Sequence, residues 1–336
     1  MKAWAIQNGF GLEHLQPLER PDPSPGSGEV LIRVRAVSLN YRDLLVTKGM
    51  YNPKLALPRV IASDGAGEVI GIGAGVKRVA VGDRVASIFM QGWLDGHLNE
   101  QRSKTALGGD IDGMLAEQVV LSEEGVVKFP SHLSFEEAAT LPCAAVTAWH
   151  ALLANGLKAG DTVLLQGTGG VSIFALQFAR MHGAKALITS GHDLKLQRAI
   201  DLGANEGTNY KSSPDWEKWA REKTGGVGVD QVIEVGGAGT LERSMRAVRV
   251  GGSIALIGVL SGGSGTVNPL SVLMRSLVVR GIFVGSRAMF EAMNRAIELQ
   301  KMRPVIDHVF GSSEVVAALR HMENGAHFGK IVIRLA

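Results

Sequence analysis

Cysteine is nearly absent from this chain, since Cys143 is the only one among 336 residues. A single cysteine excludes a disulfide within the chain and a zinc site built from several thiolates. The apolar run of about 18 residues that a membrane-spanning helix needs is also missing. The N-terminal segment MKAWAIQNGFGLEHL has neither a long apolar stretch nor a small-residue cleavage site. We therefore expect a protein of the reducing cytoplasm without a membrane span.

Charge of one sign is not concentrated anywhere in the sequence. The 35 Lys and Arg and the 32 Asp and Glu leave a formal net charge of +3, and no run of basic residues marks a nucleic-acid surface. A hydrophobic content of 46% with 20% charged residues is typical of a globular chain. The length is enough for about two domains with sizeable cores.

Glycine is abundant, with 43 residues, and the turn at 167–170 is the most informative place where it occurs. The apolar run 162–166 before the turn has the length of a strand, and 186–190 is a second such run. Between them, one helical face is formed by Val171, Phe174, Ala175, Phe178 and Ala179. Strand, glycine turn and helix in this order are typical of a dinucleotide site, because glycines let the backbone approach a pyrophosphate and the helix N-terminus offers free N–H groups. Ser172 stands at the third glycine position of the motif, so the alternative is an ordinary glycine-rich turn without a ligand.

The chain divides into a β-rich part and an alternating part. Up to about residue 125 the pattern predicts short strands, among them 30–37, 65–73 and 81–86, in a small barrel-like β domain. Ser134 and Glu137 form a capping-box pattern for a short helix, and a longer helix is expected over 144–155. From 162 onward, strands at 162–166, 186–190, 229–235, 253–259 and 279–284 alternate with helices, which predicts a parallel sheet covered on both faces. The last predicted strand, 330–334, is expected to return to the β domain.

Motifs spread over nearly the whole chain resemble those of the medium-chain dehydrogenase/reductase superfamily, and in particular its zinc-independent, quinone oxidoreductase-like branch. They are GEVLIRVRAVSLNYRD at 28–43, PRVIASDGAGEVIGIGAGV at 58–76, VGDRV at 81–85, EEAATLPCAAVTAWHAL at 136–152, VLLQGTGGVS at 163–172 and FGKIVIR at 328–334. The resemblance implies an α/β protein with a GroES-like catalytic domain formed by 1–143 and 286–336. A doubly wound Rossmann domain, 144–285, would be inserted between these two parts.

The chain differs from the zinc-dependent members of this superfamily at the positions that bind the metal. The resemblance places Asn40 and Ser63 where those members have a cysteine and a histidine ligand, Asp64 at the neighbouring glutamate and Cys143 at the third ligand. The segment 91–113, which would hold a structural zinc, has no cysteine, and its His97 is expected to be a surface histidine. An amide, a hydroxyl and one thiol are a poor ligand set for Zn²⁺, so we expect no zinc.

Without a metal, the favoured substrate is a quinone or an α,β-unsaturated carbonyl, which is already electrophilic. The candidate catalytic residues are Asn40, Tyr41, Ser63 and Asp64, and the Tyr41 phenol is a possible hydrogen-bond or proton donor. Asp64 and its neighbour Asp43 allow either a proton relay or structural ion pairs, and the structural role is favoured. Cys143 and His150 are each open to a functional or a structural reading.

The cofactor expected is NADP(H) rather than NAD(H). Ser190 stands where NAD-binding relatives place an acid, Lys195 or Arg198 could neutralise a 2′-phosphate, and Tyr210 matches a tyrosine near that phosphate. In the alternative reading Asp193 binds the ribose and Lys195 is a surface residue. The resemblance assigns the rest of the cofactor site to Thr147, Gly167, Gly169, Gly170, Val171, Gly236, Gly258, Val259, Leu260, Val284 and Gly285, with plain packing as the alternative for each.

These features favour an NADPH-dependent, metal-independent reductase acting on a small electrophile. The alternatives are an alcohol dehydrogenase-like enzyme with a non-standard or zinc-binding site, and an NADP(H)-binding protein with a structural or regulatory role. The apolar strand 278–284 predicts a homodimer through edge pairing, and neither nucleic acid nor a membrane is expected as a partner.

Overall fold

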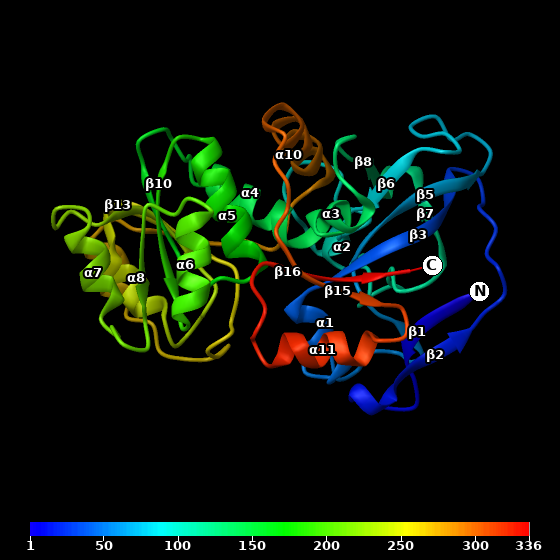
Figure 1. The fold of residues 1–336 in the computed structure, drawn as a ribbon, viewed down its shortest axis with the longest axis horizontal. Helices are drawn as coiled ribbons and strands as arrows, with labels where there is room; N and C mark the ends of the chain where they lie inside the picture. The colour runs from blue at the N-terminus through cyan, green and yellow to red at the C-terminus, as the bar shows by residue number, and fades with distance from the viewer. Residues whose placement is uncertain (336) are drawn as a thin grey trace. The chain divides into compact units, whose positions relative to one another are not determined.

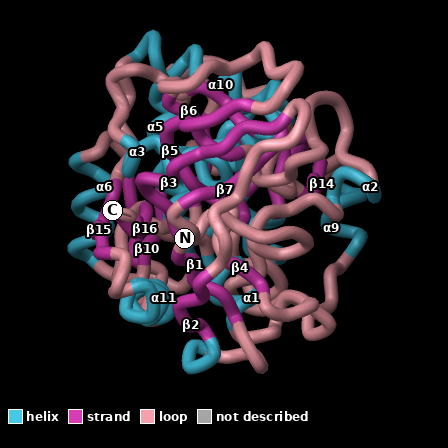
Figure 2. Tube along the Cα trace, turned by 90° about the vertical axis from the view of Figure 1, so that its right-hand side faces the viewer, coloured by secondary structure: helices cyan, strands magenta, loops and turns pink. Residues whose placement is uncertain are grey.

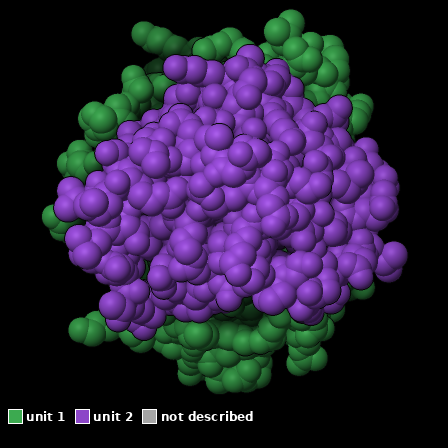
Figure 3. All heavy atoms as spheres, turned by 90° about the vertical axis from the view of Figure 1, so that its left-hand side faces the viewer, with its two compact units in different colours: residues 1–146, 285–336 green, residues 147–284 purple. Residues whose placement is uncertain are grey.

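A computed structural model describes residues 1–335, which form two compact units (Figure 3). Unit 1 comprises Met1–Val146 and Gly285–Ala336, and unit 2 comprises Thr147–Val284. The expected boundaries lie three residues earlier at the first passage between the units and one residue later at the second, so that Gly285 belongs to unit 1. None of the helices formed by residues 1–335 combines the length and the apolar character that a bilayer crossing requires.

Unit 1 is built on two β-sheets (Figure 2). The larger has seven strands in the order β15-β16-β3-β5-β6-β8, with β7 also paired to β3. These strands are β3 (Glu29–Leu39), β5 (Asp64–Ile72), β6 (Arg84–Ser87), β7 (Gln118–Ser122), β8 (Val126–Lys128), β15 (Ile306–Gly311) and β16 (Lys330–Arg334). The smaller sheet has the order β2-β1-β4, formed by β1 (Lys2–Ile6), β2 (Leu15–Glu19) and β4 (Arg59–Val60).

Strand β3 is the centre of unit 1 and sets its register. Its burial alternates from Val30 to Val34 and becomes continuous from Ala36 to Leu39. On one side β16 runs antiparallel with Ile331 opposite Leu39, and on the other β5 runs antiparallel with Asp64 opposite Ser38. The expected return of 330–334 to the β domain is confirmed. The same register brings Asn40, Asp64 and Lys330 to one end of three adjacent strands.

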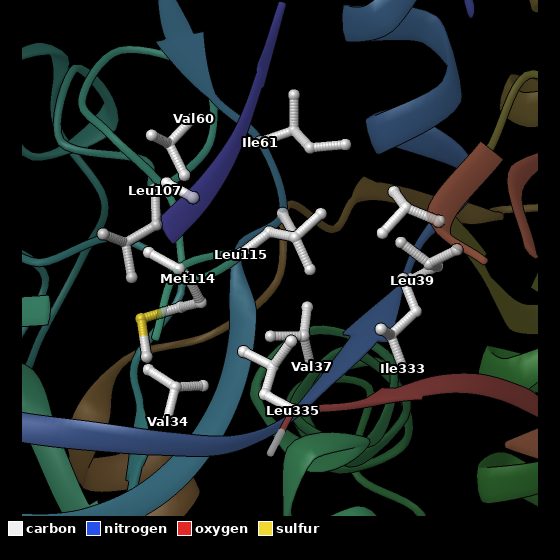
Figure 4. Packing of buried hydrophobic residues seen from close by; sticks show 14 of the residues in the cluster. Val34, Val37, Leu39, Val60, Ile61, Leu107, Met114, Leu115, Ile333 and Leu335 are labelled. Carbon is white, nitrogen blue, oxygen red and sulfur yellow. The ribbon is translucent and has the colours of Figure 1, made fainter. Parts of the chain in front are cut away.

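The core of unit 1 packs around this strand (Figure 4). Val34, Val37 and Leu39 from β3 lie with Ile333 from β16 and Leu115 from the segment before β7. Each of these five side chains is at most 1% exposed, and burying a side chain of this size contributes about 1.5–3 kcal/mol. The end of β3 that carries Asn40 is therefore held in a rigid part of the unit.

The helices of unit 1 are short except for α10. They are α1 (Tyr41–Thr47), α2 (Glu100–Ser103), α3 (Phe135–Ala139), α10 (Arg287–Gln300) and α11 (Val315–Glu323). The predicted capping box at the start of α3 is confirmed, because Glu137 N donates to Ser134 Oγ over 3.2 Å and Ser134 N to Glu137 Oε2 over 2.8 Å. The longer helix expected over 144–155 is α4 (Val146–Ala154), preceded by a π-helical turn, Leu141–Ala145.

The predicted start of one strand in unit 1 was wrong. The strand expected at 81–86 is β6, which begins only at Arg84. Gly82 has φ +91°, so the residues before β6 turn and do not extend.

Unit 2 is a parallel six-stranded sheet in the order β11-β10-β9-β12-β13-β14. Figure 1 labels its strands β10 and β13 and four helices of the same unit, α5 to α8. Its strands are β9 (Thr162–Leu165), β10 (Lys185–Ser190), β11 (Glu206–Asn209), β12 (Val229–Glu234), β13 (Val248–Leu256) and β14 (Val278–Gly281). Its helices include α5 (Gly170–Met181), α6 (Asp193–Asp201), α7 (Trp216–Glu222), α8 (Leu241–Ala247) and α9 (Pro269–Met274). This is the strand order of a Rossmann sheet, whose ligands bind where the order reverses, here between β9 and β12. The five expected strands are confirmed, although β13 ends before Val259 and β14 before Val284.

Candidate active site

The glycine turn of unit 2 leaves open space above its backbone. Gly167 has φ +72°, and Gly169 is the N-cap of α5 without a side-chain cap. A Cβ added at either glycine would meet no atom within 4 Å, so packing within the protein does not explain them. Ser172, at the third glycine position, donates its hydroxyl to Gln166 O over 2.6 Å and ties α5 to the end of β9. The open turn and the free N–H groups of α5, including those of Gly170 and Val171, fit the pyrophosphate of a dinucleotide.

Three other glycines predicted to line the cofactor are explained by packing. A Cβ at Gly236 would lie 2.2 Å from Thr240 Oγ1, and one at Gly258 would lie 2.5 Å from the carbonyl oxygen of Val235. At Gly285 the closest atom, Cγ1 of Val146, would be 2.6 Å away. Their contact with a cofactor stays a prediction.

Three further predicted cofactor residues, Thr147, Val259 and Leu260, differ in their exposure. Val259 and Leu260, in the loop after β13, are 53% and 56% exposed, which leaves their side chains open to a ligand. Thr147, on α4, is only 3% exposed.

Glu234, at the end of β12, organises the strand ends beside the glycine turn. It is fully buried and accepts hydrogen bonds from Gln166 Nε2 at 2.7 Å, from the backbone N–H groups of Gly236 and Gly237 and from the Thr240 hydroxyl. It thereby joins the carboxyl ends of β9 and β12, between which a Rossmann sheet binds its ligand. This role could not be predicted from the sequence, since a lone carboxylate at a strand end does not indicate its partners.

The structure brings Ser190 and Tyr210 together at the carboxyl ends of β10 and β11. Tyr210 N donates to Ser190 O over 3.0 Å, and the Tyr210 hydroxyl would lie 2.6 Å from a Cβ added at Gly191. Lys211 Cε is 3.2 Å from the same point, so a cation that the sequence reading missed adjoins this corner. Ser190 is 1% exposed, and its Oγ accepts from His192 N at 3.3 Å.

Asp193, the residue that would bind the ribose in the alternative reading, already has a hydrogen-bond partner. Asp193 Oδ1 accepts a hydrogen bond from Asn209 Nδ2 at 2.6 Å, which fixes the carboxylate against the end of β11. Lys195 lies on α6, half-buried.

Val284 is held in an unusual backbone conformation at the end of unit 2. Its φ of +58° is rare for a β-branched residue, and such strain is concentrated at functional sites. Its carbonyl lies 2.6 Å from His150 Nδ1, which must carry the proton because a carbonyl only accepts. Burial lowers the pKa of His150, against the hydrogen bond to Val284, which raises it. His150 therefore has a structural role in fixing Val284.

In unit 1 the predicted residues Asn40, Ser63 and Asp64 are buried and form one hydrogen-bonded cluster with Cys143 and Lys330. Asn40 Nδ2 donates to Ser63 Oγ over 3.4 Å, and Ser63 Oγ donates to Asp64 Oδ1 over 2.7 Å. Asp64 Oδ2 accepts from Cys143 N at 3.1 Å. Lys330 Nζ donates to Asn40 Oδ1 over 2.6 Å and to Leu39 O over 2.7 Å. We call these five residues the Asn40 cluster.

Burial dominates the electrostatics of the Asn40 cluster and its neighbour Asp43. It raises the pKa of Asp64, against the opposing attraction of Lys330 and the hydrogen bonds from Ser63 and Asn40. It also raises the pKa of Asp43 to about 6, against the attraction of Arg42. The pKa of the Cys143 thiol is raised by burial and then by the nearby Asp64 carboxylate, so Cys143 is an unreactive thiol at neutral pH.

The donor atoms of the cluster do not fit a zinc ion. Within residues 1–335, no three His, Cys, Asp or Glu side chains are grouped so as to hold a metal. The Asp64 carboxylate accepts hydrogen bonds from Ser63 and Cys143, and the ammonium of Lys330 already lies against Asn40. His97, the other conceivable ligand, is exposed as expected.

The predicted proton donor Tyr41 lies outside this hydrogen-bonded cluster. It is the first residue of α1 and is 44% exposed. A second tyrosine, Tyr51, is 45% exposed, and the Arg42 guanidinium lies 5.7 Å from its ring and 4.4 Å from that of Phe89. Burial raises the pKa of Tyr51, which keeps its phenol protonated as a donor. Sequence reasoning missed Arg42, Tyr51 and Lys330, and only the pairing of strands far apart in the chain identifies Lys330.

Two family models match the two parts of the chain. The model described as "Alcohol dehydrogenase GroES-like domain" matches residues 26–131, within unit 1, and confirms the expected GroES-like domain. The model described as "Zinc-binding dehydrogenase" matches residues 170–299, which begin at α5 of unit 2.

Several similar proteins match nearly the whole chain. A zinc-type alcohol dehydrogenase-like protein of Schizosaccharomyces pombe is 43% identical over 97% of this chain and 96% of its own length. The crystal structure of a putative alcohol dehydrogenase from Sinorhizobium meliloti has a TM-score of 0.93 and 42% identity, covering 99% of this chain and 98% of that one. An NAD-dependent alcohol dehydrogenase structure has a TM-score of 0.91 and 36% identity over the full length of both chains.

More distant matches include reductases. An acryloyl-coenzyme A reductase of Metallosphaera sedula is 28% identical over 99% of both chains. A mycobacterial protein solved in complex with NADPH has a TM-score of 0.83 and 26% identity over the full length of both chains.

Proposed function

Because this chain belongs to the medium-chain dehydrogenase/reductase superfamily of oxidoreductases, we propose that it is an NADPH-dependent reductase of quinones or α,β-unsaturated carbonyls that works without a metal. The observation that carries the proposal is the combination of an open glycine turn in unit 2 with the cation-containing Asn40 cluster in unit 1. The first fits a dinucleotide, and the second offers hydrogen bonding where zinc-dependent relatives bind a metal.

In this proposal the residues of unit 2 bind and orient the dinucleotide. The backbone at Gly167, Gly169 and Gly170 accommodates the pyrophosphate, and Val284, fixed by His150, borders the nicotinamide. The bound dinucleotide supplies a hydride. Glu234 keeps the strand ends in place.

The residues of unit 1 bind the acceptor. Reduction of an enone or a quinone places negative charge on the acceptor oxygen, and a fixed N–H donor stabilises that charge. Asn40 is the best candidate, because it is the most exposed of the polar residues Asn40, Ser63, Asp64 and Lys330, at 9%. Tyr51, with its protonated phenol, and Tyr41 are the candidate proton donors to the reduced product.

The NADPH preference has support at the corner formed by Ser190, Tyr210 and Lys211. It contains a cation, a phenol and a hydroxyl, and the acid Asp193 is bonded to Asn209. A distant relative was solved with NADPH, whereas a closer one is described as NAD-dependent. Fluorescence titration with both cofactors, followed by an acceptor screen, tests the proposal. Equal affinity for NADH, or no turnover of any quinone or enone, would contradict it.

A second candidate is a zinc-dependent alcohol dehydrogenase. It is favoured by the "Zinc-binding dehydrogenase" model and by the names of the closer relatives. Stoichiometric zinc in the purified protein, with alcohol oxidation lost on chelation, would support this candidate over the first.

We also propose that the protein is a homodimer. Strand β14 is the last strand of its sheet and all four of its residues are exposed. Exposed edge strands of this kind pair readily with a second copy.

A further inference from the structure

We propose that Lys330 is a positioning residue of the active site: its buried ammonium binds the oxygen of the Asn40 amide, so that the N–H side is the one that can donate to the acceptor oxygen, and it supplies the positive charge that zinc supplies in metal-dependent relatives. This inference rests on the proposed function. It adds a residue that neither the motifs nor the comparisons assign.

Lys330 is buried, and hydrogen bonds hold its ammonium in place. Its side chain comes from the first position of β16 and is only 3% exposed. A buried lysine costs free energy unless its ammonium is hydrogen-bonded and its charge is compensated. Here Nζ donates to Leu39 O and Asn40 Oδ1, and its charge acts on the buried Asp64 carboxylate.

The ammonium determines which way the Asn40 amide points. Lys carries only donors, so the atom of Asn40 that lies 2.6 Å from Nζ must be the amide oxygen. The amide nitrogen then faces away from Lys330, and one of its hydrogens is directed at Ser63 Oγ, 3.4 Å away. The bond to Ser63 is long, and Asn40 also contributes a hydrogen bond that lowers the pKa of Asp64. An acceptor oxygen would replace one of these two partners as the acceptor of an Asn40 N–H.

The same contact strengthens that donor. A cation bonded to an amide oxygen draws electron density from the nitrogen, and hydrogen bonds in such a chain reinforce one another. Charge that develops on an acceptor oxygen bonded to Asn40 Nδ2 is thus stabilised by Lys330 through Asn40. No proton needs to leave Lys330 in this scheme.

A double-mutant cycle tests whether Lys330 acts through Asn40. The enzymes compared are wild type, K330M, N40A and K330M/N40A, with NADPH and an enone as substrates. Removing an oxyanion donor costs about 10²–10³-fold in kcat, so N40A should fall by that much. Removing the residue that orients a functional group costs about 10–100-fold, which we expect for K330M. The double variant should be no slower than N40A alone, whereas multiplication of the two single effects would overturn the proposal.

Two control variants distinguish a positioning role of Lys330 from a role in folding stability. K128M removes a lysine of unit 1 that pairs with Asp83 at 2.6 Å on the surface, and should keep the wild-type kcat. K330M leaves Asp64 without its cation, so K330M/D64N, which removes both charges, should regain thermal stability. The proposal expects kcat of that variant to remain low. Recovery of stability and kcat together would show a purely structural lysine.

A second readout does not depend on turnover. In protein labelled with ¹⁵N-asparagine, the Asn40 side-chain amide signal is identified by its loss in N40A. It should shift in K330M and stay in place in K128M, and an unchanged signal in K330M would overturn the proposal. A wild-type enzyme without any reductase activity would refute the proposed function alone, and the amide signal would still decide the Lys330–Asn40 contact.

Discussion

Lys330 and Asn40 are 290 residues apart in the chain, yet Lys330 Nζ donates a hydrogen bond to Asn40 Oδ1 over 2.6 Å. The contact follows from the antiparallel register of β16 and β3, in which Ile331 is paired with Leu39. The neighbouring pair Ser38 and Asp64 brings the acid to the same end of the sheet. A buried cation, an amide and a buried acid are thus assembled by three strands.

An alanine in the glycine turn should have little effect on the stability of the free protein but should weaken binding of the cofactor. Gly169→Ala places its Cβ in open space at φ −80°, so the free energy of unfolding should fall by less than about 1 kcal/mol. NADPH affinity should fall about tenfold or more, because the methyl group occupies the place of the pyrophosphate. Gly258→Ala is the matched control: its Cβ meets the Val235 carbonyl, and it should destabilise the protein by about 1–3 kcal/mol. Urea unfolding and fluorescence titration measure both effects, and unchanged NADPH affinity in the Gly169 variant would argue against the turn as the binding site.

Lys211 should contribute to the choice between NADPH and NADH. The exposed lysine adjoins Gly191 and Tyr210, so K211A should weaken NADPH binding by about two- to fivefold, with less effect at high salt. NADH affinity should not change, because NADH has no 2′-phosphate. K218A, which removes an exposed lysine paired with Asp215, serves as the control. An equal loss for both cofactors would place Lys211 outside the phosphate site.

The sequence predicted the strands and helices better than it predicted the side-chain contacts of the candidate site. Periodicity and the glycine turn were enough for the five strands and α5 of unit 2, because these signals are local. The motif resemblance selected Asn40, Ser63 and Asp64, which the structure brings together. Lys330 could not be found in this way, because its role depends on the register between two strands at opposite ends of the chain.

The sequence also did not show which glycines are required by packing. Gly169 and Gly258 look alike in a motif, but an added Cβ would meet protein atoms only at Gly258. Tyr41 was chosen for its place beside Asn40, but the direction of a side chain at the start of a helix is set by tertiary packing. Arg42, Tyr51 and Phe89 come together from separate segments for the same reason.

Asp43 should make the protein less stable as the pH rises from about 4 to about 6. Its pKa is raised from 3.8 to about 6 in the folded state, so between these values the folded state holds the proton that the unfolded state has released. The unfolded state is then favoured, by on the order of 3 kcal/mol once the pH exceeds about 6. D43N lacks this titration and keeps an acceptor for Asn40 N. Urea unfolding of both proteins at about pH 4.5 and about pH 7.5 should show wild type losing stability relative to D43N, and a constant difference would contradict the raised pKa.

The proposed dimer should depend on β14. Wild type should sediment at twice 35.6 kDa, and V278E, with a charge on the exposed edge strand, should sediment as a monomer. L299E changes a leucine of α10 that is 80% exposed and should leave the dimer intact. A wild-type protein that sediments as a monomer, or a V278E variant that remains dimeric, would refute pairing through this strand.

Removal of metal is the most direct test of the account as a whole, because the Asn40 cluster is proposed to work with the charge of Lys330 in place of zinc. Protein dialysed against EDTA and shown by metal analysis to hold far less than one zinc per chain is mixed with NADPH and a set of quinones and enones. The consumption of NADPH is followed by its absorbance. The account predicts the same turnover before and after dialysis, with no gain when zinc is restored. Turnover that disappears with the metal and returns with added Zn²⁺ would contradict it.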